Sequence, residues 1–263
     1  MSCKITKNLV NGRNDMKNKF RSLIMKHNME RGVFRFKQFS CQHFGSSMRI
    51  GVDAVLLGAW ASVDGARILD VGTGCGVIAL MCAQRNDTAI VDAVETDAPS
   101  VEEAGINFNS SPWGDRLNVF HDNYLSFNPA YKYDRIVSNP PYFDSGVDSE
   151  ASVRMHARHE GDLSPISLLR HGLDLLEPDG SVSMVVPYLR AETIIVQARD
   201  MGFYPVRRLD VSGHAEADVK RCLLEFNQDS RSVCKTGRMA LEIAPTVPTP
   251  EYRELCKDFY LYF

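Results

Sequence analysis

Several common sequence features are missing from this chain of 263 residues. The seven cysteines are scattered and contain no C-x-x-C pair, so reduced thiols are expected instead of a disulfide framework or a zinc knuckle. No apolar run approaches the roughly 20 residues that span a bilayer. The first 30 residues also lack the apolar segment of a secretory signal. These absences predict a cytoplasmic protein without a membrane segment.

The composition, 44% hydrophobic and 24% charged, suits one α/β domain. The charge is unevenly distributed, because residues 1–36 carry nine Lys and Arg against Asp15 and Glu30, whereas the whole chain has a formal net charge of −3. We therefore expect a basic, flexible N-terminal arm at 1–33 and a single domain at 34–263. The arm either meets nucleic-acid phosphates or is a solvated tail, and the sequence leaves both interpretations open.

Hydrophobic patterning predicts an alternation of strands and helices. The expected strands are a short ribbon at 34–39 and then 67–71, 89–95, 117–121, 133–137, 181–187, 204–211 and 221–227. One expected helix begins near Asp53, which is its predicted N-cap. Further helices are expected over 98–109, 163–176, 190–201 and 252–263. This alternation predicts a Rossmann-like α/β fold: a seven-stranded, mostly parallel sheet with an antiparallel last strand and helices on both faces.

A glycine-rich turn, Gly72-Thr73-Gly74-Cys75-Gly76, follows a buried strand. Glycines let the backbone approach a ligand closely, and the helix after the turn offers unpaired N–H groups. A dinucleotide fingerprint needs a glycine where Val77 stands, and a P-loop needs a Gly-Lys-Ser/Thr ending that is missing. What remains is a turn for the methionine end of S-adenosylmethionine, with Gly72 and Gly74 against the ligand and Asp70 near its amino group.

Two acids stand at the ends of the next two strands. Glu95 follows Gly72 by 23 residues, the place of an acid that binds both hydroxyls of a ribose. Asp122 ends the following strand, where it can accept a hydrogen bond from the exocyclic amine of an adenine. Asp97, Asp115 and His121 are interpreted as local caps or surface residues.

The fourth strand of the sheet ends in Asn139-Pro140-Pro141-Tyr142, a rigid corner because each proline fixes its own φ and restrains the residue before it. Beside a methyl donor, such a corner suits transfer to a planar amino group. The Asn139 side-chain oxygen and the Pro140 carbonyl would accept the two amino hydrogens, and Tyr142 would stack on the base. Asn139, Pro140 and Tyr142 are the candidate catalytic residues, and Asn139 is also expected to contact the cofactor.

The polar segment 144–163 is interpreted as a partly basic lid over the crevice. It contains His156 and His159, but these have no good third or fourth ligand, so no metal is expected. A monomer is expected.

The order of short motifs is more specific than any one of them. Besides the glycine turn and the Asn-Pro-Pro-Tyr corner, the distinctive stretches are Lys37-Gln38-Phe39, His43, Met48-Arg49-Ile50-Gly51-Val52-Asp53, Leu56-Leu57-Gly58-Ala59-Trp60-Ala61 and Phe259-Tyr260-Leu261. This order resembles the bacterial valine-tRNA adenine-N6 methyltransferase family over roughly residues 34–263, with 37–61 the discriminating part. The resemblance implies a class I S-adenosylmethionine-dependent enzyme that methylates the adenine just 3′ of the anticodon, with the tRNA anticodon loop as its partner.

Other functions share these motifs. A glutamine-N5 methyltransferase of release factors would hold a side-chain amide at the same corner, although such enzymes generally carry a larger helical N-terminal domain. An rRNA guanine-N2 methyltransferase would use the same mechanism. A DNA adenine methyltransferase would need a separate base-reading domain. A non-catalytic binder of S-adenosylmethionine or RNA belongs to a different class.

Overall fold

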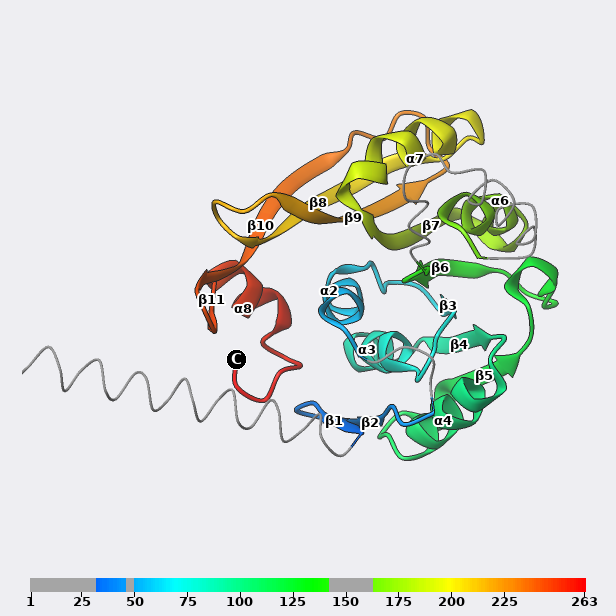
Figure 1. Cartoon of the computed structure of the whole chain (residues 1–263). Coiled ribbons are helices and arrows are strands. Elements are labelled where there is room, and N and C mark those ends of the chain that lie inside the picture. Colours follow the sequence, from blue (N-terminus) through cyan, green and yellow to red (C-terminus); the bar gives the residue numbers. More distant parts are fainter. Residues whose placement is uncertain (1–31, 46–49, 142–162) are drawn as a thin grey trace, which may run out of the picture.

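A large twisted sheet with helices on both faces forms the molecule (Figure 1), in a computed structural model that describes residues 32–45, 50–141 and 163–263. The strands of the sheet are β3 (Arg67–Val71), β4 (Ile90–Glu95), β5 (Leu117–His121), β6 (Tyr133–Ser138), β7 (Leu176–Pro187), β8 (Tyr204–His214), β9 (Val219–Asn227), β10 (Lys235–Ala244) and β11 (Val247–Pro248). The helices are α2 (Val52–Trp60), α3 (Val77–Arg85), α4 (Ala98–Asn109), α6 (Pro165–Leu175), α7 (Tyr188–Asp200) and α8 (Pro250–Cys256). A separate hairpin consists of β1 (Val33–Arg35) and β2 (Ser40–Gln42).

The strand order is β11-β10-β8-β9-β7-β6-β3-β4-β5. The strands from β7 through β6, β3 and β4 to β5 pair in parallel, and β9 is antiparallel to both β7 and β8. The predicted Rossmann-like class I fold is therefore confirmed. The predicted number of seven strands is too small, because the described part of the sheet holds nine.

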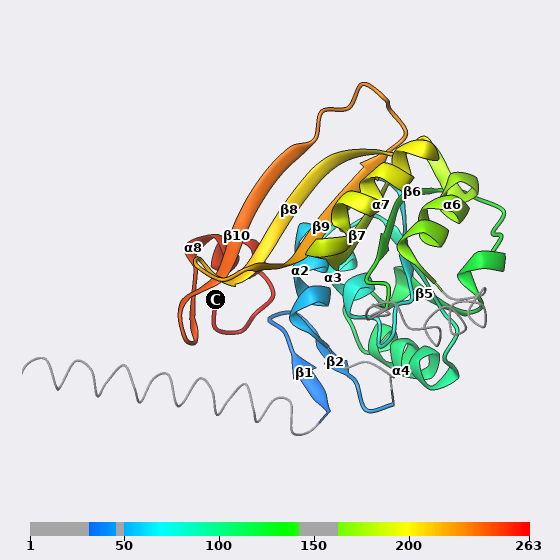
Figure 2. The ribbon, with the colours of Figure 1, turned by 45° about the horizontal axis from the view of Figure 1, so that its top comes forward.

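The two missed strands extend the sheet at one edge. β10 pairs in parallel with β8, and β11 pairs with the end of β10. Met239, Leu241 and Ile243 alternate along the second half of β10, but Lys235–Arg238 show no such pattern and only Met239 is buried, so the apolar signal of this strand is short. Figure 2 shows β8, β9 and β10 curving away together towards α8.

Several predicted element bounds are corrected by tertiary contacts. The N-cap of α2 is Gly51, not Asp53, whose carboxylate instead forms an ion pair with Arg221 on β9 (Nε–Oδ2 2.6 Å). The C-terminal helix ends at Cys256, because the chain then turns so that Tyr260 pairs with Phe36. Of the ribbon predicted at 34–39, Phe34 and Arg35 belong to β1, and the remaining residues connect β1 to β2.

The expected gap between the helix at 163–176 and the strand at 181–187 is not present. Pro178-Asp179-Gly180 lies inside β7, where the pairing with β6 is irregular. On α4, the apolar residue Ile106 is 44% exposed.

The sheet has a hydrophobic core on each face. Side chains of α2, α3, α4 and α8 fill one core, and side chains of α6 and α7 fill the other. Successive strand residues point to opposite faces, so Ile68 enters the first core and Leu69 the second. Five cysteines are buried: Cys41, Cys75, Cys82, Cys222 and Cys256. No described helix is long and apolar enough to cross a membrane.

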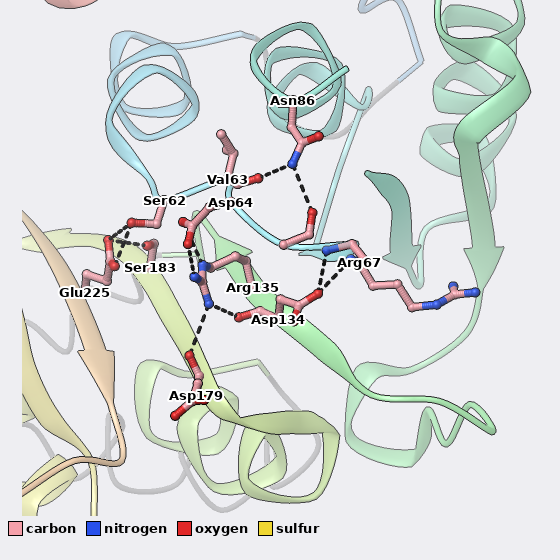
Figure 3. A network of polar contacts seen from close by, with 12 residues as sticks. Ser62, Val63, Asp64, Arg67, Asn86, Asp134, Arg135, Asp179, Ser183 and Glu225 are labelled. Carbon is pink, nitrogen blue, oxygen red and sulfur yellow. Dashed lines mark hydrogen bonds and ion pairs between the residues drawn. The ribbon is translucent and has the colours of Figure 1, made fainter. Parts of the chain in front are cut away.

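A polar network joins the elements at the edge of the sheet where the parallel strands begin (Figure 3). The Asp134 carboxylate accepts from the amides of Ala66 (2.7 Å) and Arg67 (2.9 Å). The Glu225 carboxylate accepts from the hydroxyls of Ser62 (2.8 Å) and Ser183 (3.3 Å), and the Arg207 Nε also donates to it (3.0 Å). These contacts tie α2 and the strand ends together, which leaves the opposite edge for the site.

Replacing Glu225 by Ala should lower the free energy of unfolding by about 2 to 4 kcal/mol, because loss of this buried carboxylate removes the acceptor of the Ser62 and Ser183 hydroxyls and the ion-pair partner of Arg207. Glu192→Ala is the matched control: it removes an ion pair with Arg208 in which the glutamate side chain is 75% exposed, and should cost under about 1 kcal/mol. Urea unfolding of both variants measures the difference. Equal losses of unfolding free energy in the two variants would contradict the inference that the buried Glu225 contacts stabilise the fold more than the exposed Glu192–Arg208 pair.

Candidate functional site

The parallel strands bring the predicted site residues to one edge of the sheet. Val71, the last residue of β3, pairs with Ser138, the last residue of β6, and the Ser138 hydroxyl donates to the Val71 carbonyl (2.8 Å). The glycine turn and Asn139 therefore begin side by side. On the other flank of β3, Val71 pairs with Val94, so Glu95 also ends its strand at this edge.

Left-handed backbone shapes the glycine turn. Gly72, Gly74 and Gly76 have φ values of +67°, +55° and +86°, which side chains other than hydrogen rarely tolerate. A Cβ on Gly74 would meet nothing within 4 Å, whereas one on Gly76 would lie 2.4 Å from the ring of Phe108. The turn therefore rests on α4 at Gly76 and presents open backbone at Gly74, as the close approach of a ligand requires.

Asp70 is fully buried at the base of this turn. Its Oδ2 accepts from the Thr73 hydroxyl (2.6 Å) and from the Ala79 amide (3.0 Å), and its Oδ1 has no hydrogen-bond partner among the described residues. Burial raises the pKa of Asp70 from 3.8 to about 7. An ammonium group donating to Oδ1 would satisfy this oxygen and favour the ionised form, so the residues present fit the amino group of the expected cofactor.

Glu95 is connected to the same turn. Its Oε2 accepts from the Gly74 amide (2.9 Å), and its Oε1 accepts from the amides of Thr96 (2.8 Å) and Asp97 (3.0 Å). A carboxylate offers about four acceptor positions, so Oε2 retains capacity for a hydroxyl donor beside Gly74. The expected ribose contact fits this arrangement, and the backbone donors hold the carboxylate in place for it.

Asp122 lies next to Glu95 at the edge of the sheet. Its amide donates to the Glu95 carbonyl (3.1 Å), and its exposed carboxylate accepts from the Asn123 amide (2.7 Å). Glu95 and Asp122 therefore follow one another along the edge, in the order in which a nucleoside presents its ribose and its base. Asp97 is the N-cap of α4, as interpreted, with its carboxylate accepting from the Ser100 amide (3.1 Å).

The structure describes only the first part of the predicted Asn-Pro-Pro-Tyr corner. Asn139 is half-buried and Pro140 is buried. Tyr142 lies outside the described residues, and so do His156, His159 and most of the predicted lid and arm. Within the described ranges, no group of three or more His, Cys, Asp or Glu residues could hold a metal ion.

Sequence reasoning missed three residues that shape the site. Thr73 fixes the Asp70 carboxylate, Phe108 supports Gly76, and Asn107 on α4 donates to the Cys75 carbonyl (2.8 Å). Thr73 lies inside the glycine turn, and its short separation from Asp70 in the sequence is a signal from which this hydrogen bond could have been predicted. The roles of Asn107 and Phe108 depend on how α4 packs, which no local pattern reports.

Asp70→Asn should make the stability of the ligand-free protein less dependent on pH. Because the folded-state pKa of Asp70 is raised, the folded chain binds a proton more tightly than the unfolded chain, and stability falls as pH rises from about 4 to about 7. Asn removes this loss, so the variant should gain about 3 kcal/mol relative to the native chain as the pH rises from 5 to 8. Denaturant titrations across this pH range measure the free energy of unfolding of both proteins. The same pH dependence in the variant and in the native chain would contradict a raised pKa of Asp70.

Solved structures share the fold. A predicted O-methyltransferase of Agrobacterium tumefaciens superposes with a TM-score of 0.63 at 18% identity, covering 79% of this chain and 96% of that one. A putative class I S-adenosylmethionine-dependent methyltransferase of Listeria monocytogenes gives a TM-score of 0.52 at 14% identity, covering 79% and 73%. At these identities the likeness concerns the fold alone.

Sequence comparison reaches further. The family described as methyltransferase small domain matches residues 50–194. The tRNA1(Val) (adenine(37)-N6)-methyltransferase of Parabacteroides distasonis is 40% identical over 236 residues, which are 89% of this chain and 99% of that protein. The enzyme of the same name from Vibrio campbellii is 37% identical, covering 87% and 95%. By these matches over nearly full length, the chain belongs to the family of tRNA1(Val) (adenine(37)-N6)-methyltransferases.

Proposed function

We propose that this chain transfers the methyl group of S-adenosylmethionine to the exocyclic N6 of adenine 37, in the anticodon loop of a valine tRNA. The observation that carries the proposal is the pairing of Val71 with Ser138, which makes the glycine turn and the Asn-Pro-Pro corner neighbours. Relatives that bear the name of this reaction match along nearly their whole length. A cytoplasmic monomer is the form we propose for the enzyme.

The cofactor supplies a methyl group on a sulfonium centre, and this chain's residues hold it at the edge of the sheet. We assign the amino group to Asp70, whose buried Oδ1 lacks a partner among the described residues. The backbone of Gly72 and Gly74 supports the methionine end. Glu95 takes the ribose hydroxyls and Asp122 the adenine amine, which matches their succession along the edge. Asn139, next to Gly72 through the strand pairing, completes the cofactor-binding set.

The acceptor corner activates a weak nucleophile by geometry. The lone pair of an adenine N6 is delocalised into the ring. If the Asn139 side-chain oxygen and the Pro140 carbonyl accept the two amino hydrogens, the lone pair is directed at the methyl group. The proton leaves the cationic nitrogen after transfer, so no strong base is required. The stacking role of Tyr142 is proposed from the sequence.

Names of relatives decide between the acceptors that share this mechanism. The full-length matches are named for an adenine of tRNA, and they favour that acceptor over a release-factor glutamine or an rRNA guanine. A non-catalytic role would leave the convergence of donor and acceptor motifs without a use.

Incubation with labelled S-adenosylmethionine and an unmodified valine tRNA transcript should yield N6-methyladenosine at position 37, identified by nuclease digestion and mass spectrometry. A transcript with guanosine at position 37 should accept no label. Release factor and bulk rRNA, offered in parallel, should also stay unlabelled. Label in either of these, or at another tRNA position, would replace the proposed acceptor by the one found.

Asn139→Ala should lower kcat at least about 100-fold, because it removes one of the two acceptors that orient the amino group. The Kd for S-adenosylhomocysteine should rise much less, by about threefold or under, since Asp70 and Glu95 still hold the cofactor. Single-turnover rates and calorimetry separate the two effects. Native-like turnover in the variant would exclude Asn139 from catalysis.

Deleting residues 1–30 should weaken tRNA binding and flatten its dependence on salt, because the deleted segment carries most of the cations of residues 1–36. Binding of S-adenosylhomocysteine is the control and should not change. Fluorescence anisotropy with labelled tRNA at several salt concentrations measures the slope. An unchanged slope would place the phosphate contacts on the domain itself.

A further inference from the structure

Helix α4 joins two segments that lie far apart in the sequence, the N-terminal hairpin and the glycine turn. The link is the side chain of Asn107, which is only 2% exposed. Its Nδ2 donates to the carbonyls of Gln42 (2.9 Å) and Cys75 (2.8 Å), and its Oδ1 accepts from the Gln42 amide (2.8 Å). One side chain thus fixes β2 and the turn to the same point of α4.

The same helix makes further contacts on both sides of this link. The ring of Phe108 lies directly against Gly76, so the turn cannot shift towards α4. One turn earlier, the Glu103 carboxylate accepts from the amides of Phe44 and Gly45. Backbone groups of the hairpin and of the residues after it are therefore hydrogen-bonded to side chains of α4. These contacts hold the hairpin next to the glycine turn.

A turn with three glycines needs anchors outside itself. Glycine loses more conformational freedom than any other residue when it is ordered, so the left-handed sequence of Gly72, Gly74 and Gly76 is costly to hold. The two intervening residues supply the anchors. Thr73 is held through its hydroxyl by Asp70, and Cys75 is held through its carbonyl by Asn107.

We propose that Asn107 is a positioning residue for the cofactor: by holding the Cys75 carbonyl it sets the orientation of the turn at Gly74, without touching the ligand itself. The inference rests on the proposed function in that the ligand is taken to be S-adenosylmethionine. Without the hydrogen bond from Asn107, the turn can sample other conformations in the ligand-free protein. Ordering the turn then costs conformational entropy when the ligand binds, which weakens binding. Cofactor affinity therefore depends on α4 and on the hairpin that Asn107 also holds.

An asparagine that bridges backbone groups can also serve stability alone, and the half-buried Asn86 is a comparable example. Asn86 donates through Nδ2 to the carbonyls of Val63 (2.6 Å) and Gly65 (3.0 Å), and its Oδ1 accepts from the amides of Thr88 (3.0 Å) and Ala89 (2.8 Å). These bonds are of the same kind, but they lie at the opposite edge of the sheet (Figure 3). Asn86→Ala is therefore the control for a purely structural effect.

The test compares Asn107→Ala with Asn86→Ala, using calorimetric binding of S-adenosylhomocysteine well below the unfolding temperatures and kcat at saturating cofactor. Both variants should lose thermal stability. Only Asn107→Ala should raise the Kd, by about tenfold, as expected for one lost hydrogen bond of about 1.4 kcal/mol, while its kcat stays within about threefold. An unchanged Kd in Asn107→Ala, or an equal rise in Asn86→Ala, overturns the inference.

Asn107→Asp keeps the test decisive if the alanine variant does not fold. Its carboxylate retains the acceptor for Gln42 but faces two carbonyls, so only the protonated acid can donate to Cys75. At pH 8 the ionised carboxylate has no hydrogen to donate, so the Kd of this variant should exceed that of the native chain by at least about tenfold, and an unchanged Kd contradicts the donor role. Native protein that binds S-adenosylhomocysteine but methylates no tRNA would refute the proposed function alone, and native protein that does not bind it would refute both.

Discussion

The pairing of β3 with β6 is the contact on which the site depends. These strands are distant in sequence, and their parallel register sets Val71 against Ser138, with the Ser138 hydroxyl fixing the last step of the ladder. A slip of one residue would turn every side chain of β6 to the other face of the sheet and would move Asn139 away from Gly72. The two cores, one on each face, fix this register because Ile136 belongs to one and Val137 to the other.

The cofactor half of the site is built mainly from backbone, and its few side chains hold backbone in place. Asp70 binds the hydroxyl of Thr73 and the first turn of α3 through the Ala79 amide, and Glu95 binds the amide of Gly74. The acids that recognise the ligand in our proposal thus also set the shape of the turn. One oxygen of Asp70 holds the carboxylate in place, while the other is buried without a partner among the described residues and is the oxygen that we assign to the ligand.

Sequence reasoning succeeded where a pattern is local. The glycine turn, the acid at the end of β4 and the Asn-Pro-Pro stretch after β6 are each short local patterns, and the parallel order of the strands brings them to one edge of the sheet. It failed where the cause is a distant contact. β10 has only a short apolar alternation in its second half and buries Met239 alone, and its pairing with β8 extends over the polar first half as well. Asn107 looks like any polar residue near a helix end, and only packing places it between Gln42 and Cys75.

Two of the stretches on which the family resemblance is based, at 37–39 and 259–261, are structural neighbours. The amide of Lys37 donates to the Phe259 carbonyl (2.9 Å), and Phe36 pairs with Tyr260 while its ring stacks on that of Phe39. The beginning and the end of the domain therefore hold the hairpin between them. The hairpin in turn reaches the glycine turn through Asn107. The stretches around Lys37 and Phe259 thus pack on the hairpin that Asn107 joins to the glycine turn, so their contribution to the proposed site is made through the fold.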